Sequence, residues 1–123
     1  MTPSATKLIV ILPALNEERT IGLVIAAIPK TITGISTIET IVIDDGSTDR
    51  TREVAEAAGA TVVRHHTNMG VGAAFKTGLR EALKAGADII VNIDADGQFN
   101  PVDIAELIRP IQENIAHFVT ASR

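Results

Sequence analysis

The sequence predicts an α/β domain in which helices cover both faces of a mostly parallel sheet. Two observations support this fold class: short runs of β-branched residues alternate with longer amphipathic segments, and 123 residues fit one domain. We therefore interpret residues 1–123 as a single domain. Parallel strands need right-handed crossovers, and ligands of such folds bind at the carboxyl ends of the strands.

The first three elements follow from the apolar pattern at the start of the chain. Residues 7–13 form a continuous apolar run, which is typical of a strand buried on both faces. Residues 18–28 carry Ile and Val at helical spacing, and Pro29 ends this expected helix. The β-branched run at 38–44 predicts the second strand.

The middle of the chain predicts two more helices around a short third strand. A helix is expected at 49–58, after a cluster of capping residues and before Gly59, a residue type favoured just beyond a helix end. The strand is expected at 61–64, and the next helix at 72–85.

The last third repeats the same alternation. Residues 88–94 are strongly apolar and predict the fourth strand. Asn100 and Pro101 are typical of the cap and first residue of a fourth helix, which Pro110 should bend or shorten near its end. A fifth strand is expected at 117–122.

Composition and charge exclude several classes of protein. Ile, Val, Leu and Phe make up about 30% of the chain, which excludes disorder, and the absence of cysteine excludes disulfide scaffolds and zinc ribbons. A net charge of −4 and an aromatic content of 2% argue against nucleic acid as a partner. The longest apolar run, residues 8–15, is too short for a membrane helix, so we expect no transmembrane segment in this chain.

A polar segment follows each of the first four expected strands. These segments are residues 13–17, 44–49, 68–73 and 94–98. In a parallel sheet, all four lie at the same edge. Each segment alone has an ordinary structural explanation, such as a turn, a helix cap or a chance Asp-x-Asp. Their placement at four successive strand ends favours a binding site.

Carboxylates at this edge predict a metal-dependent site. Asp44, Asp45, Asp94 and Asp96 would crowd one side of an already acidic protein. Like charges this close raise one another's pKa or require a cation. Oxygen ligands at the spacing of Asp94 and Asp96, with Gln98 nearby, suit Mg²⁺ or Mn²⁺ that is also bound by substrate phosphates. The simplest ligand is a nucleotide diphosphate carrying a metal.

Two other patterns favour a structural interpretation. His65 and His66 are adjacent on a strand and face opposite ways, with no third ligand spaced for them, so we do not predict a metal site there. Lys76, Arg80 and Lys84 lie four residues apart on the expected third helix, and we interpret them as a solvated face rather than as a phosphate clamp.

Four segments resemble, in this order, the N-terminal half of a family 2 glycosyltransferase: ILPALNEERTI, IVIDDGSTDRT, HTNMGVGAAFKTG and NIDADGQ. Within that family they are most similar to polyprenyl and dolichyl phosphate mannose or glucose synthases. The resemblance implies a GT-A fold, which is a Rossmann-like nucleotide-diphospho-sugar-binding domain. It also implies a donor such as UDP-glucose or GDP-mannose, inverting transfer of the sugar, and a polyprenyl phosphate as acceptor.

The resemblance assigns nucleotide contacts to particular residues. The nucleoside pocket would be lined by Pro13, Ala14, Leu15 and Glu17. Asp45 would contact the base, and Asp44 would lie beside it near the ribose.

It also assigns the metal and acceptor contacts. Asp94 and Asp96 match the signature that holds the divalent ion on the donor diphosphate, with Gln98 as companion, and Asp94 also counts as a nucleotide contact. Arg123 matches an arginine near the acceptor phosphate, although position 121 is Ala where the family has Gly. No catalytic base is visible in the chain.

Family members continue well beyond this length, into a half that carries the acceptor site. We therefore expect a truncated domain, a homo-oligomer or a chain missing its C-terminal half. The absent half normally places an antiparallel strand between the fourth and fifth strands, so we expect an open edge on the fourth strand. The expected location is the cytoplasm, peripheral to the inner face of the membrane.

The main alternative is a non-catalytic module or subunit that binds a nucleotide sugar. A phosphohydrolase with an Asp-x-Asp nucleophile would carry that motif on its first strand, which this chain does not. A dinucleotide oxidoreductase would show Gly-x-Gly-x-x-Gly after the first strand, and a Walker-type kinase would show a Gly-Lys-Ser/Thr loop. Neither pattern is present.

Overall fold

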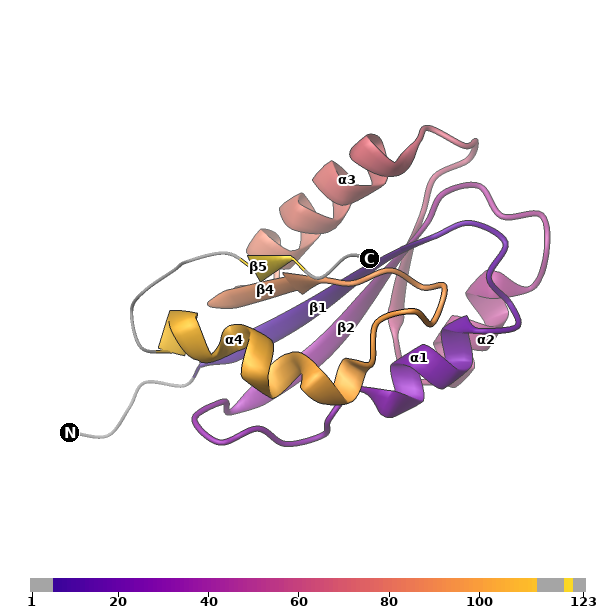
Figure 1. The fold of residues 1–123 in the computed structure, drawn as a ribbon. Helices are drawn as coiled ribbons and strands as arrows, with labels where there is room; N and C mark the ends of the chain where they lie inside the picture. Colours follow the sequence, from indigo (N-terminus) through magenta and orange to yellow (C-terminus); the bar gives the residue numbers. More distant parts are fainter. Residues whose placement is uncertain (1–5, 113–118, 121–123) are drawn as a thin grey trace.

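The computed structural model describes residues 6–112 and 119–120. Its sheet consists of β1 (Lys7–Ala14), β2 (Thr37–Asp44), β3 (Thr61–Arg64), β4 (Ile89–Asn92) and β5 (Val119–Thr120). The strand order is β3-β2-β1-β4-β5, and all four pairings are parallel. The predicted α/β architecture is confirmed (Figure 1).

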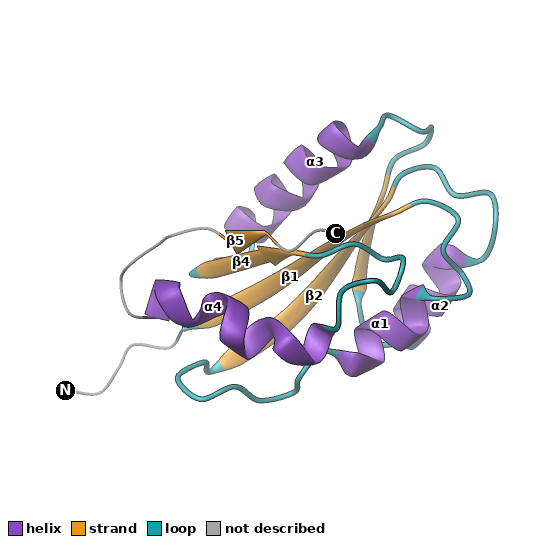
Figure 2. Cartoon of the chain, in the orientation of Figure 1, coloured by secondary structure: helices purple, strands orange, loops and turns teal. Residues whose placement is uncertain are grey.

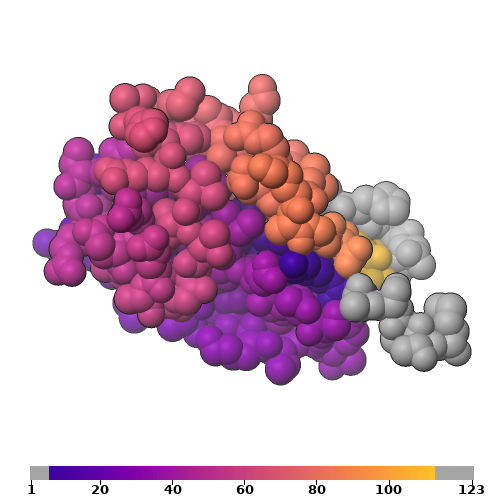
Figure 3. All heavy atoms as spheres, turned by 180° about the vertical axis from the view of Figure 1, so that it is seen from behind, coloured from indigo at the N-terminus to yellow at the C-terminus, as the bar shows by residue number. Residues whose placement is uncertain are grey.

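Helices cover both faces of this sheet. They are α1 (Ile21–Ala27), α2 (Thr51–Ala57), α3 (Val71–Lys84) and α4 (Ile104–Gln112), and a short 3₁₀ turn, η1 (Pro101–Asp103), precedes α4. Buried residues of α1, α2 and α4 pack on one face, whereas α3 packs on the other (Figure 1). Seen from behind, the residues of α3 spread over the surface of that second face (Figure 3).

β1, the central strand, contributes side chains to the hydrophobic cores on both faces of the sheet. Alternate side chains of β1 point to opposite faces, so Leu8, Val10 and Leu12 join one core and Ile9 and Ile11 join the other. All five are completely buried, as the continuous apolar run predicts. The parallel arrangement brings the carboxyl ends of β1 to β4 to one edge, where the loops gather (Figure 2).

Both helices that follow β1 and β2 begin later than expected. The helix predicted from residue 18 begins at Ile21, because a turn comes first in which the carbonyl of Glu17 accepts the N–H groups of Thr20 and Ile21. The helix predicted from residue 49 begins at Thr51, because Asp49 lies in the turn before it, where its carboxylate accepts the N–H and the hydroxyl of Thr51.

β4 is shorter than predicted and has a partner on its outer edge. It ends at Asn92 rather than at residue 94: the N–H of Ile93 still donates to the carbonyl of Ile11 (3.1 Å), and a turn begins at residue 95. The expectation of an open edge on β4 is wrong: Val119 and Thr120 pair in parallel with Val91 and Asn92. The helical connection through α4 returns the chain directly beside β4. The other residues of the predicted fifth strand lie outside the described residues.

The last helix shows the predicted cap. The side chain of Asn100 accepts the N–H of Val102, and Pro101 opens η1. Pro110 lies inside α4, and the helix ends two residues later at Gln112. Among the described helices, none has the length and apolar character needed to cross a membrane.

Candidate functional site

The carboxyl edge of the sheet contains a cavity of about 400 Å³ beside the start of α3. This volume is within the usual range of about 300–1,000 Å³ for small-molecule sites. Its lining residues come from the ends of β1, β2 and β4 and from the loop before α3: Pro13, Ala14, Leu15, Glu17, Asp45, Asn68, Gly70, Val71, Ala74, Asp94, Ala95 and Asp96. The structure thus brings together most of the predicted nucleotide and metal contacts.

Asp45 is the most firmly held carboxylate of the cavity. Its Oδ1 atom accepts hydrogen bonds from Nδ1 of His65 (2.8 Å) and the N–H of Met69 (2.9 Å), and Oδ2 accepts the N–H of Gly70 (2.9 Å). Burial favours the neutral acid, but these hydrogen bonds outweigh it and lower the pKa of Asp45. The cavity therefore contains a fixed, ionised hydrogen-bond acceptor.

The loop before α3 is shaped to supply those two N–H groups. Gly70 has φ of +100°, a conformation that favours glycine, and the N–H groups of Met69 and Gly70 both point to Asp45. The Asn-x-Gly-x-Gly segment is therefore a loop-to-helix turn whose first amides bind a protein carboxylate.

His65 is a site residue that the sequence analysis missed. Its Nε2 atom lies 2.8 Å from Oγ1 of Thr77, a buried residue of α3. Because an ionised carboxylate can only accept, Nδ1 of His65 must donate to Asp45. The register between β2 and β3 predicts this contact. Asp44 and Arg64 form the last pair of the two strands, so the residues that follow them, Asp45 and His65, are neighbours too.

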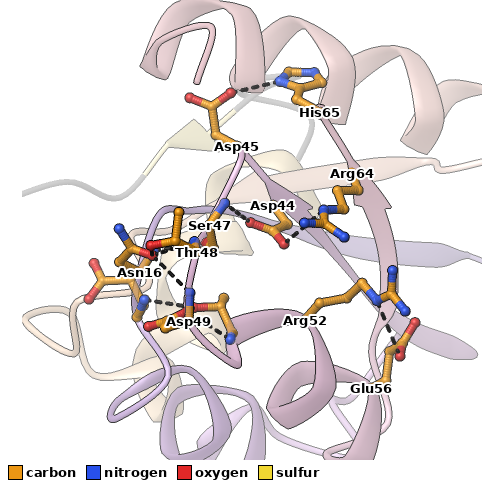
Figure 4. A network of polar contacts seen from close by, with 12 residues as sticks. Asn16, Asp44, Asp45, Ser47, Thr48, Asp49, Arg52, Glu56, Arg64 and His65 are labelled. Atoms are coloured by element: carbon orange, nitrogen blue, oxygen red, sulfur yellow. Dashed lines mark hydrogen bonds and ion pairs between the residues drawn. The ribbon is translucent and has the colours of Figure 1, made fainter. Parts of the chain in front are cut away.

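Asp44, by contrast, lies outside the cavity. It follows the alternation of β2 and points to the opposite face from Asp45 (Figure 4). Its carboxylate accepts the N–H of Ser47 (2.9 Å) and lies 4.0 Å from Nε of Arg64. The structure therefore does not bring Asp44 to the other predicted nucleotide contacts, and its bonds hold the turn after β2.

A network of polar contacts joins the loops after β1 and β2 on this opposite side (Figure 4). Oδ1 of Asn16 accepts the N–H groups of Thr48 (2.8 Å) and Asp49 (3.3 Å), and the Asn16 N–H donates to Oγ of Ser47 (2.8 Å). Asn16 has φ of +53°, a conformation uncommon outside glycine. We call Asn16, Ser47, Thr48 and Asp49 the loop lock.

The loop lock places Glu17 at the cavity. The N–H of Glu17 donates to Oγ1 of Thr51 (2.8 Å), and its side chain faces the cavity. Close by, the hydroxyl of Thr20 donates to the carbonyl of Ala95 (2.7 Å), which ties the start of α1 to the segment between Asp94 and Asp96. Segments far apart in the sequence are thereby fixed around one cavity.

Acidic residues at the β4 end of the cavity repel one another. Burial and the charge of Asp96 raise the pKa of Asp94. Burial, followed by the charge of Asp96, also raises the pKa of Glu17. A cation here would relieve this repulsion.

The arrangement of donors fits a hard divalent ion held partly by a ligand. Across residues 6–112 and 119–120, no group of three or more His, Cys, Asp or Glu side chains is close enough to hold a metal alone. Mg²⁺ commonly takes one or two carboxylates and completes its shell with phosphate and water, and Asp94 and Asp96 meet that need. Gln98 lines a neighbouring cavity with Asp96, and its N–H donates to Oδ1 of Asp96 (3.0 Å).

The remaining predictions have mixed outcomes. Lys76, Arg80 and Lys84 are exposed, and the last two lie 3.8 Å from Glu81, which confirms the solvated face. Arg123 lies outside the described residues.

Comparison with known proteins agrees with this geometry. The model of the family described as glycosyl transferase family 2 matches residues 9–123. UDP-N-acetylglucosamine–dolichyl-phosphate N-acetylglucosaminyltransferase of Methanococcus voltae is 37% identical, over 97% of this chain and 53% of the relative. Undecaprenyl-phosphate mannosyltransferase of Micrococcus luteus is 29% identical, over 95% of this chain and 48% of the relative. The chain thus spans about half the length of these relatives.

Solved structures give the same result. A glucosyl-3-phosphoglycerate synthase from Mycobacterium tuberculosis, in complex with Mn²⁺, uridine-diphosphate-glucose and phosphoglyceric acid, superposes with a TM-score of 0.68. The two are 36% identical, and the match covers 88% of this chain and 39% of that one.

Proposed function

Since the chain belongs to glycosyl transferase family 2, we propose that its cavity binds a nucleotide sugar with a divalent cation, for inverting transfer of the sugar. One observation carries the proposal: a fixed ionised acceptor, Asp45, and a mutually repelling acidic pair, Asp94 and Asp96, line the same cavity. This arrangement suits a ligand with a hydrogen-bond donor at one end and a metal-bound diphosphate at the other.

The nucleoside would occupy the part of the cavity between β1 and Asp45. Pro13, Ala14 and Leu15 supply a mostly apolar wall there, and Asp45 supplies the polar contact to the base. Sites for small molecules commonly combine an apolar lining with a few fixed polar groups. Glu17 lines the same cavity as the acidic pair.

Asp94 and Asp96 would hold Mg²⁺ or Mn²⁺. The ion supplies Lewis-acid neutralisation of the charge that develops on the departing diphosphate. The Mycobacterium tuberculosis relative was solved with Mn²⁺ and uridine-diphosphate-glucose, which supports this type of donor. The protein itself contributes the carboxylates and their fixed position between β4 and α1.

We propose a polyprenyl phosphate as the acceptor, at the cytoplasmic face of the membrane. The names of the Methanococcus and Micrococcus relatives both specify lipid phosphates of this kind. A phosphate nucleophile is already ionised, so it needs no general base, whereas a hydroxyl acceptor would need one. Arg123 is the proposed contact for this phosphate.

Calorimetric titration of the chain with UDP and with GDP, each with and without Mn²⁺, tests the proposal. We expect one diphosphate to bind in a metal-dependent manner. Absence of Mn²⁺-dependent binding of either would contradict the proposal. An assay of sugar transfer to a polyprenyl phosphate then separates a transferase from a module that only binds the donor.

A further inference from the structure

A row of buried polar side chains runs from the middle of α3 to the cavity. It begins at Oγ1 of Thr77, passes through both ring nitrogens of His65 and ends at Oδ1 of Asp45, with 2.8 Å at each step. The side chain of His65 is 12% exposed, and Thr77 is 7% exposed. Each group in the row depends on its neighbour, because removing one member leaves the next without its hydrogen-bond partner.

The hydrogen bonds leave Asp45 with a limited and directed capacity. A carboxylate offers about four acceptor positions, two on each oxygen. Oδ1 accepts from His65 and Met69, and within residues 6–112 and 119–120 Oδ2 accepts only from Gly70. One acceptor position is left, on an oxygen of a residue that lines the cavity.

An acceptor fixed in this way selects among nucleobases by their chemistry. Uracil and guanine both present a ring N–H beside a carbonyl, which can donate to Oδ2. Cytosine presents a ring nitrogen lone pair at that point and carries its donor on the exocyclic amine instead. A carboxylate that could swing would follow the amine, whereas a carboxylate held by three donors meets the lone pair and is repelled.

We propose that His65 and Thr77 are positioning residues that fix the free acceptor of Asp45, and that the site therefore selects uracil or guanine nucleotides over cytosine nucleotides. The inference rests on the proposed function, because it assumes that a nucleotide occupies the cavity. It assigns the specificity to His65, the residue that follows β3, and to Thr77 of α3, which lies behind the ligand-facing wall.

The experiment measures base selectivity rather than affinity alone. The full chain is titrated with UDP, GDP, CDP and inorganic pyrophosphate, each with Mn²⁺. For the wild type, we expect the better of UDP and GDP to bind about ten- to a hundredfold more tightly than CDP, the range expected for one hydrogen bond to a charged group. The affinity for pyrophosphate reports on the metal end of the cavity, which the row of Thr77, His65 and Asp45 does not touch.

Two variants break this row of hydrogen bonds at different residues. His65→Ala removes the donor to Asp45, and Thr77→Val removes a hydroxyl with little change of shape. Both should lower the preference for UDP or GDP over CDP several-fold and leave pyrophosphate binding unchanged. Thr77→Ser restores the hydroxyl and should restore the preference. His66→Ala, at the exposed neighbouring histidine, is the matched control for His65→Ala and should behave as the wild type.

The outcomes separate this inference from the function on which it rests. If the variants lose nucleotide and pyrophosphate affinity together while the preference over CDP is kept, His65 and Thr77 are merely structural and the inference is overturned. A wild type that binds UDP, GDP and CDP equally well also overturns it, yet leaves nucleotide binding intact. A wild type that binds no diphosphate with Mn²⁺ overturns the proposed function itself. Should His65→Ala fail to fold, Thr77→Val and Thr77→Ser decide the question.

Discussion

Asp44 and Asp45 are adjacent, both almost completely buried, and both follow the core of β2, yet they serve different regions of the molecule. Asp44 points towards α2 and satisfies the turn through Ser47 and Arg64. Asp45 points towards α3, is held by three donors, and keeps one acceptor position on a residue that lines the cavity. The difference teaches that two adjacent buried carboxylates can serve different regions, because side chains alternate along a strand and each points to its own face of the sheet.

The cavity side of this comparison is most strongly tested by Asp96→Asn. This change removes one of the two carboxylates that would hold the metal but none of the core. Loss of an outer-shell partner alone costs about 10–100-fold in metal affinity, so loss of a direct ligand should cost more. We expect Mn²⁺-dependent nucleotide binding to be abolished in calorimetry, with little loss of stability in urea denaturation.

The variant Gln98→Ala is the control for that experiment. Gln98 is exposed, lines the neighbouring cavity and contacts Asp96 through its backbone N–H, which the substitution keeps. A much weaker effect than that of Asp96→Asn is expected. Unchanged Mn²⁺-dependent affinity in Asp96→Asn would count against the metal assignment.

The comparison of the two aspartates is tested directly by Asp44→Ala and Asp45→Ala. Asp44→Ala leaves the N–H of buried Ser47 without its acceptor and should lower the free energy of unfolding by about 1–3 kcal/mol. Its affinity for the nucleotide should not change. Asp45→Ala should lower both stability and the discrimination between bases, measured with UDP, GDP and CDP.

An equal loss of nucleotide affinity in the two variants would contradict the division of roles.

Much of this fold could be predicted from the sequence, because each element depends on a local pattern. The apolar run at 7–13 predicted a strand buried on both faces, as observed, and the strand at 61–64 has the predicted bounds. The starts of α1 and α2 could not be predicted, because Glu17 and Asp49 bind the first N–H groups through contacts that the apolar spacing does not report.

Of the site, the sequence could predict only which residues gather at the carboxyl ends of the parallel strands. Asp45, Asp94 and Asp96 line one cavity because parallel strands end at one edge. Asp44 and Asp45 point to opposite faces because side chains alternate along β2, and the grouping of all four aspartates at one edge did not take this alternation into account. The role of His65 depends on the register between β2 and β3, which is a tertiary property.

Acid titration gives the smallest effect and separates the two ends of the cavity. The pKa values of Asp94 and Glu17 are raised by burial and by the charge of Asp96. On acidification these two groups therefore bind protons at a higher pH in the folded state than in the unfolded state. Their protonation adds stability as the pH falls towards about 4, the ordinary value for carboxylic acids. The pKa values of Asp45 and Asp49 are lowered, because hydrogen bonds outweigh the effect of burial.

The contribution of Asp45 and Asp49 is therefore present above about pH 4 and is lost as the pH falls through their lowered pKa values. Urea denaturation of the metal-free protein should show stability rising slightly on acidification from pH 7 and then falling below about pH 4. Asp96→Asn should flatten the rise, because it removes the charge that raises the pKa of both Asp94 and Glu17. Asp45→Asn should make the fall shallower. A wild-type profile without the rise, or an Asp96→Asn profile in which the rise is undiminished, would show that the charge of Asp96 does not act on its neighbours.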